Sequence, residues 1–203
     1  MKKYLKHSIF LFTIITVVIG CKKEIKPAKV VEKKSIEKMS NADLGLKYAM
    51  TTKAQLGKNL MGSIQNKGTE EAVTFCNVRA FTLTDSMAVV QKVNIKRVSD
   101  KPRNSNNEAN MKELNLIATF KNDLASGKKM APIIESLDKD SIQFYYPILT
   151  KKMCLQCHGV PNKDIKPAVL KKITDLYPTD QAIGYSENQV RGIWSVTMKN
   201  HEN

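Results

Sequence analysis

The order of helical and strand-like periodicity along the chain is the strongest constraint on its fold. Apolar residues recur at alternating steps of three and four through residues 41–68, and the pattern returns through residues 69–91, as expected for one face of each of two helices. Asn41 is the predicted cap of the first helix and Gly68 is its predicted end. The two helices are therefore predicted to form a hairpin, with Cys76 on its buried seam.

Strand-like segments follow these helices and come mostly in the C-terminal half. Segments in which apolar and polar residues alternate, or which are rich in β-branched and aromatic residues, predict strands. Apolar residues spaced by three or four predict further helices. The predicted strands are 92–99, 141–150 and 192–198, and the predicted helices are 108–127 and 166–178. These helices are too few to connect a doubly wound parallel sheet. The predicted fold class is therefore α+β, an antiparallel sheet with an N-terminal helical hairpin and additional packed helices.

The first 21 residues have the composition of an export signal. Three lysines precede the apolar run of residues 9–19, which is too short for a comfortable transmembrane helix but typical of a signal-peptide core. The sequence VIGC at residues 18–21 resembles the lipobox of bacterial lipoproteins, which implies cleavage before Cys21 and lipidation of its thiol. A plain signal peptide that is cut elsewhere, or an uncleaved anchor, are the alternatives.

Three parts of the chain are predicted: a lipoprotein signal peptide over 1–20, a charged tether over 21–40 and one globular domain over 41–203. The net charge is +14, of which residues 1–39, with ten lysines and three glutamates, carry +7. The globular part has no arginine-rich run, so nucleic acid is not an expected partner. The expected location is the exported side of a membrane, with the lipid anchor holding the protein towards the periplasm or the cell exterior.

The chain has four cysteines: Cys21, Cys76, Cys154 and Cys157. The last two belong to the sequence CLQCH at residues 154–158, here named the CLQCH segment, for which three chemistries compete. A structural zinc site needs four ligands, usually from two such cysteine pairs, and the sequence has no second pair. A redox dithiol would be expected where a strand leads into a helix, whereas the residues after His158 have the composition of a loop.

Covalent haem attachment requires all three reactive residues of the CLQCH segment, in this order. The thiols of Cys154 and Cys157 can reach the two vinyl groups of one haem, and the imidazole of His158 can then bind the iron. The export signal agrees with this interpretation, because such attachment takes place on the exported side of the bacterial membrane. Ligation by a second histidine of the chain is not expected, since His7 lies in the signal peptide and His201 near the C-terminus.

The residues alone leave the second axial ligand open. Methionine is the common partner in small c-type cytochromes, which makes Met198, on the last predicted strand, one candidate. Other candidates are Met87, Met111 and Met130. Each of these methionines is expected to fill a core instead. Cys76 is an unpaired thiol in an exported protein, yet its helical periodicity favours a small buried hydrophobe over a ligand.

One known family is similar to this chain from about residue 41 to residue 199. The similarity is carried by the stretches YYPILTKKMCLQCHG, YPTDQAIGYSENQVRGIWSVTM, EEAVTFCNVRA and RVSDKPRNSNNEAN, which resemble parts of the Tll-type c-haem-binding family. The resemblance implies a PAS-like fold and one covalent haem c, bound through Cys154 and Cys157. It also implies that His158 and Cys76 are the axial ligands of the iron.

Together these observations predict an exported, lipid-anchored c-type haem protein in redox or gas sensing or in single-electron transfer. A redox or signalling protein is its expected partner. One alternative is an electron-transfer cytochrome in which His158 and a methionine bind the iron. Another is a non-catalytic interaction lipoprotein with a silent CLQCH segment. An enzyme such as a peroxidase is not expected, because the sequence shows no distal histidine for acid–base catalysis.

Overall fold

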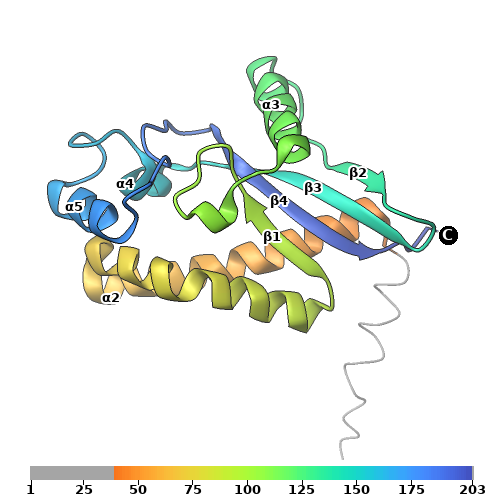
Figure 1. Ribbon diagram of the computed structural model, residues 1–203, viewed down its shortest axis with the longest axis horizontal. Helices are drawn as coiled ribbons and strands as arrows, with labels where there is room; N and C mark the ends of the chain where they lie inside the picture. The colour runs from red at the N-terminus through yellow and green to blue at the C-terminus, as the bar shows by residue number, and fades with distance from the viewer. Residues whose placement is uncertain (1–38, 203) are drawn as a thin grey trace, which may run out of the picture.

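The computed structural model describes residues 39–202. The predicted signal peptide, Cys21 and most of the predicted tether lie outside the described residues. Figure 1 shows one antiparallel sheet with a long helical hairpin along one side and a separate helix on the other. The predicted α+β class, a PAS-like antiparallel sheet with packed helices, is thereby confirmed. Among residues 39–202, no helix combines the length and apolar character needed to cross a membrane.

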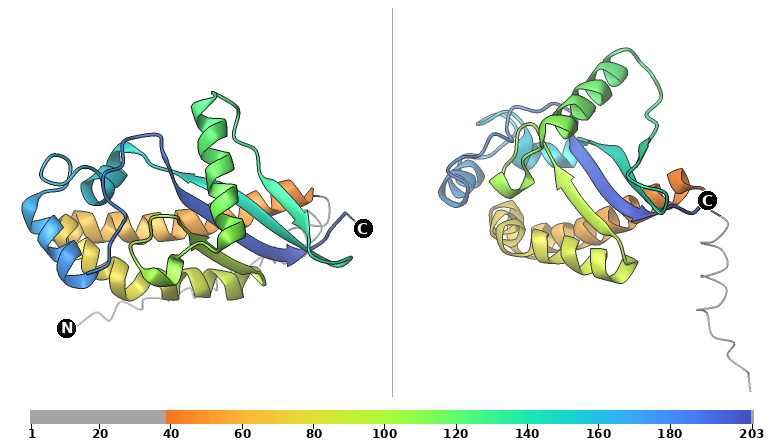
Figure 2. Two further views of the ribbon diagram at one scale, coloured as in Figure 1. Left: turned by 45° about the horizontal axis from the view of Figure 1, so that its top comes forward. Right: turned by 45° about the vertical axis from the view of Figure 1, so that its right-hand side comes forward.

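Helix α2 (Asn41–Gln91) is the hairpin that the periodicity predicts. It is interrupted at Gly68, whose φ of 83° and ψ of 168° are not helical. Residues 41–67 form the first arm and residues 69–91 the second, and the arms run along the same side of the sheet (Figure 2). Gly68 ends the first arm as predicted, because a backbone in this region is open to glycine and strained for other residues.

The start of α2 differs from the prediction by one residue. Ser40, rather than Asn41, is the N-cap, and its hydroxyl accepts a hydrogen bond from the backbone N–H of Asp43 at 3.1 Å. The side chain of Asn41 instead donates to Oδ1 of Asn200 at 2.8 Å and accepts from the backbone N–H of His201 at 3.0 Å. The first turn of the hairpin is thereby tied to the end of the last strand.

The sheet has the order β1-β4-β3-β2, and all neighbouring strands are antiparallel. Its strands are β1 (Asn94–Val98), β2 (Ile133–Ser136), β3 (Ser141–Leu149) and β4 (Val190–Lys199). The sequence predicts three of them but not β2. Four residues are too few to show a period, and these become a strand only through pairing with β3. The long pairing of β3 with β4 forms the centre of the sheet, with an irregularity near Ile148.

Helices cover both faces of the sheet. The arms of α2 cover the face that carries Phe144 and Trp194, and α3 (Met111–Ala125) covers the opposite face with Ile117 and Phe120. All four of these side chains are at most 2% exposed. Burying one such side chain stabilises the fold by roughly 1.5–3 kcal/mol relative to leaving it in water. The two cores therefore fix the sheet between the hairpin and α3.

The connection from β3 to β4 carries three short helices at one end of the hairpin (Figure 1). They are η2 (Lys152–Cys154), α4 (Leu155–His158) and α5 (Pro167–Leu176). Val169 and Ile173 of α5 are buried in one cluster with Val73 of the second arm. This packing holds the whole connection, and with it the CLQCH segment, against the second arm.

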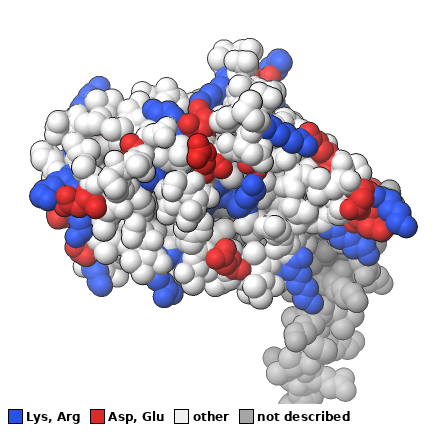
Figure 3. Space-filling view, viewed as in Figure 1, with Lys and Arg blue, Asp and Glu red and all other residues white. Residues whose placement is uncertain are grey.

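Charged side chains are dispersed over the surface that faces the viewer in Figure 3. Lysine and arginine alternate there with aspartate and glutamate, and uncharged residues separate them. Mixed charges of this kind keep a surface hydrated without creating a large field of one sign.

Candidate functional site

The CLQCH segment forms two short helical turns directly after β3. Cys154 ends η2, and Cys157 and His158 close α4. The hydroxyl of Thr69 donates to Oε1 of Gln156 at 2.9 Å, which attaches the segment to the beginning of the second arm. After α4, residues 159–166 form an irregular loop instead of the helix expected after a redox dithiol.

His158 is held in one tautomer by the loop that precedes β4. Its Nδ1 lies 2.7 Å from the carbonyl oxygen of Ala182, and because a carbonyl oxygen only accepts, Nδ1 carries the proton. Nε2 is then the nitrogen with an available lone pair. Desolvation of the ring, and then the positive charges of Arg103 and Arg191, hold the pKa of His158 well below its usual range. The imidazole is therefore neutral at pH 7, which is the form that binds metal ions.

Two backbone hydrogen bonds fix the same loop to the CLQCH segment. The N–H of Tyr185 donates to the carbonyl oxygen of His158 at 2.9 Å, and the N–H of Gly184 donates to that of Gly159 at 2.8 Å. A side chain at Gly159 would force a shift of this backbone, because its Cβ would lie 2.5 Å from Cβ of Asp164 and 2.6 Å from the carbonyl oxygen of Leu155. The orientation of His158 thus depends on a close approach that glycine permits.

Arg103, in the loop after β1, binds the carbonyl oxygen of the residue before His158 and that of the residue that accepts from the His158 ring. Its Nη2 donates to the carbonyl oxygens of Cys157 at 2.6 Å and Ala182 at 3.3 Å. Its Nε and Nη2 also donate to the two carboxylate oxygens of Asp180, at 3.2 and 3.0 Å. The side chains of Arg103 and Asp180 are 13% and 7% exposed, so this is a buried, bidentate ion pair. No local period in the sequence indicates this role, because the partners lie 54 to 79 residues away.

Cys76 lies half-buried on the second arm, and its thiol is free. Burial raises the pKa of the Cys76 thiol, and the positive charges of Arg97 and Arg103 oppose that rise. Burial likewise raises the pKa of Cys157 to about 11, with a contribution from Cys76. Interactions of this kind require proximity, so the structure brings Cys76 to the CLQCH segment. Its role as an iron ligand stays a prediction.

The structure places Met198 far from the CLQCH segment. Met198 pairs with Ile142, seven residues before Leu149, and therefore at the opposite end of β3. At about 3.3 Å per residue the separation is roughly 23 Å. Met198 is also buried in the core under α2. The remaining candidates lie elsewhere: Met111 is 76% exposed at the start of α3, Met130 packs on the α3 side, and Met87 is about three turns beyond Cys76.

The donors at this site fit covalent haem better than zinc. Within residues 39–202 no group of three or more cysteine, histidine, aspartate or glutamate side chains could hold a metal ion together, so zinc gains no support. Haem needs two thiols for attachment and at least one protein ligand for iron. Cys154 and Cys157 are free thiols, and the adjacent His158 is neutral with Nε2 available.

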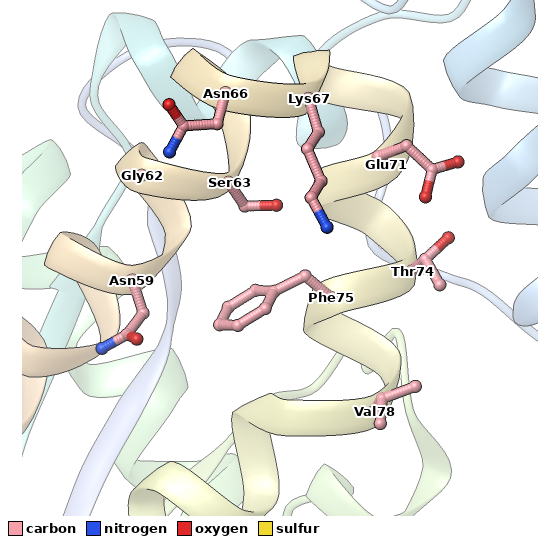
Figure 4. Close-up of a pocket in the computed structure, with 9 residues that line it drawn as sticks. All are labelled: Asn59, Gly62, Ser63, Asn66, Lys67, Glu71, Thr74, Phe75 and Val78. Atoms are coloured by element: carbon pink, nitrogen blue, oxygen red, sulfur yellow. The ribbon is translucent and has the colours of Figure 1, made fainter.

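A separate pocket of about 370 Å³ lies between the two arms of α2 (Figure 4). Phe75 and Val78 of the second arm and Asn59 and Ser63 of the first are among the residues that line it. The helical period of 3.6 residues places Phe75 and Val78 on a different side of the second arm from Cys76. The pocket therefore does not coincide with the surface that faces the CLQCH segment.

Fold and site together define a PAS-like α+β domain with a Cys-x-x-Cys-His segment docked on a helical hairpin. The chain belongs to the Tll0287-like family, whose model matches residues 21–199. A solved structure described as that of the cyanobacterial heme-protein Tll0287 is similar, with 22% identity, 76% of this chain and 94% of that chain covered, and a TM-score of 0.53. At this identity the likeness shows a shared fold. No curated protein matches the chain.

Proposed function

We propose that this chain is an exported, lipid-anchored c-type haem protein that acts in redox or gas sensing or in single-electron transfer. One haem would be attached through Cys154 and Cys157, with His158 and Cys76 as the iron ligands. The geometry of His158 carries the proposal, because its ring is neutral and its Nδ1 is engaged by Ala182. Membership of the Tll0287-like family supports it, since a solved protein of the same fold is described as a heme-protein.

Haem bound here would supply one-electron chemistry, and the side chains around it would set the state of its ligands. Cys76 would bind as a thiolate and must therefore lose its proton. Arg97 and Arg103 favour the thiolate, while burial opposes it. An anionic sulfur ligand favours ferric iron, so a low reduction potential is expected. If a small ligand displaced Cys76, the change would arise on α2, from which a partner protein could detect it.

The test is to produce the full chain in a host that attaches haem c and to extract it with acidic acetone. The haem should stay with the protein, and the absorption spectrum should be that of six-coordinate, low-spin iron. The double variant Cys154→Ala/Cys157→Ala should lose all extraction-resistant haem. A wild-type protein without covalent haem would overturn the proposal, and a high-spin spectrum would contradict ligation by Cys76.

The lipid anchor is the part of the proposal that rests on the N-terminal sequence. The lipobox-like residues 18–21 place a cysteine directly after the apolar run, where lipoproteins carry their lipid. Cys21→Ser should release the protein from the membrane fraction into the soluble fraction. Unchanged membrane retention would instead indicate an uncleaved helix or a protein partner.

A further inference from the structure

The CLQCH end of the molecule contains three arginines: Arg97 on β1, Arg103 in the following loop and Arg191 on β4. Arg191 interacts electrostatically with each of the other two. Asp180 neutralises Arg103 through a bidentate contact. Arg97 and Arg191 have no such carboxylate contact among the described residues, so positive charge is in excess beside Cys76 and His158.

Arg97 is the clearest case of a half-buried cation with an unpartnered donor. Its Nε is buried and makes no hydrogen bond to any described residue. The ionisable groups that act on it are Cys76, Arg191 and Tyr177, none of which is a carboxylate. Arg97 pairs in register with Trp194 of β4, which places their Cβ atoms about 5 Å apart on one face of the sheet. The indole Nε1 of Trp194 is also buried and also without a partner in residues 39–202.

Arg191 is held in place by neutral groups. Its Nη1 donates to Oγ of Ser99 at 2.6 Å, and its guanidinium lies 5.3 Å from the centroid of the Tyr185 ring. Its Nε is buried and has no hydrogen-bond partner within the described chain. Asp180 acts on Arg191 only at longer range, since no hydrogen bond or ion pair joins these two described side chains. The guanidinium group of Arg191 is thus held in position, but no carboxylate of the described chain neutralises its charge by direct contact.

A buried N–H donor without an acceptor costs free energy, and the planar guanidinium group of arginine is suited to bind a carboxylate. A haem attached through its vinyl groups still carries two ionised propionate side chains, which need cationic partners when water is excluded. We propose that Arg97 and Arg191 bind the propionate carboxylates of the haem, an inference that rests on the proposed function. The unpartnered Nε–H groups beside Cys76 and His158 are the donors that this interaction would satisfy.

The test uses the full chain with its haem attached and compares Arg97→Met, Arg191→Met and the double variant by resonance Raman spectroscopy. The propionate bending bands should shift in each single variant and shift further in the double variant. The reduction potential should fall, since positive charge near the iron has been removed. The amount of extraction-resistant haem should not change.

Arg79→Met is the matched control, because Arg79 is exposed on α2 one turn beyond Cys76 and its loss removes the same charge. Its propionate bands should stay as in the wild type. Should a methionine variant fail to accumulate, Arg97→Lys and Arg191→Lys can replace it. They keep the positive charge but lose the planar guanidinium group, and should still shift the propionate bands.

Unchanged propionate bands in the arginine variants would overturn the inference while leaving the haem assignment intact. A change of iron spin state in Arg97→Met, with propionate bands unchanged, would show that Arg97 stabilises the Cys76 thiolate. That result would overturn its proposed contact with a propionate. Absence of covalent haem from the wild-type protein is a different result, which overturns the proposed function itself.

Discussion

Buried polar groups on the α3 side of the sheet have hydrogen-bond partners within the chain, whereas several at the CLQCH end of the molecule have none among the described residues. On the α3 side, the buried carboxylate of Glu113 accepts from the backbone N–H of Asn110 at 3.1 Å and pairs with Nζ of Lys96 at 2.8 Å. The side chain of Gln143 donates to Oγ of Ser195 at 2.9 Å. These groups find their partners within the chain, so the fold alone accounts for them.

The CLQCH end contains groups that the described chain does not satisfy. The Nε atoms of Arg97 and Arg191 are buried without partners, and the thiols of Cys76, Cys154 and Cys157 are free. Groups of this kind are retained where something other than the chain completes them. The contrast teaches that the hairpin and the α3 side provide stability, whereas the CLQCH end is organised for binding.

The largest loss of stability is expected for Asp180→Ala, at the CLQCH end. This change leaves the guanidinium of Arg103 buried without its carboxylate, which should cost about 3–5 kcal/mol of the free energy of unfolding. Urea denaturation followed by circular dichroism measures the loss. Because Arg103 also binds the carbonyl oxygens beside His158, haem attachment should become less efficient as well.

The matched control is Asp123→Ala, which breaks the ion pair of Asp123 with Lys128 at the end of α3. In that pair the side chains are 30% and 68% exposed, so the expected cost is about 1 kcal/mol or less. Equal costs for the two aspartate variants would contradict the view that the CLQCH end depends on a buried charge.

A smaller loss of stability is expected for Gly68→Ala, at the junction of the two arms. The φ of 83° is unfavourable for alanine even though the space around Gly68 is open, so the cost should be about 1–3 kcal/mol. Gly62→Ala is the control, since Gly62 lies within the helical first arm with open space beside it, and alanine should stabilise a helix there by up to about 1 kcal/mol. Thermal unfolding distinguishes the opposite signs.

Most of the fold could be predicted because the relevant signals are local. The period of residues 41–91 and the glycine at position 68 indicate the hairpin without any knowledge of what it packs against. The last strand and α5 follow from similar patterns. β2 could not be predicted, since its four residues are a strand only because β3 pairs with them. The N-cap could not be assigned to Ser40 from the sequence, because Asn41 is equally suited to that role by residue type.

The candidate site could be predicted only in part. Cys154, Cys157 and His158 are contiguous, so their chemistry is visible in the sequence. Cys76 could be placed on a helical seam by its period, whereas its proximity to Cys157 follows from the docking of α4 on the second arm. The arginine cluster could not be predicted, because β1, its following loop and β4 meet only in the folded chain.

A smaller effect, confined to stability, is expected for Glu113→Gln on the α3 side. The amide can still accept from the N–H of Asn110 but loses the charged contact with Lys96, which should cost about 1–2 kcal/mol. The haem spectrum should stay unchanged, because the contacts of Glu113 with Asn110 and Lys96 involve no residue of the candidate site. Glu70→Gln, at an exposed position, should be nearly neutral in the same denaturation experiment. A spectral change in Glu113→Gln would show that the two regions are coupled.

The smallest loss of stability, about 1 kcal/mol, is expected for Cys76→Ala, because the thiol is small and only half-buried. Its spectral effect should nevertheless be large. Without a thiolate on the iron, the ferric spectrum should shift towards high spin. Affinity for imidazole, cyanide or carbon monoxide should rise, and the reduction potential should rise as an anionic donor is lost.

Met198→Ala should have the opposite effects to Cys76→Ala: a large loss of stability and no change in the haem spectrum. Met198 is 4% exposed in the core under α2, so its truncation should cost about 2–5 kcal/mol. Its spectrum should match that of the wild type, because Met198 lies at the opposite end of β3 from the CLQCH segment. Absorption spectra and denaturation curves of both variants together test which residue is the second iron ligand. A normal spectrum in Cys76→Ala, or an altered one in Met198→Ala, would exclude Cys76 as the ligand while leaving the attachment of haem through Cys154 and Cys157 unaffected.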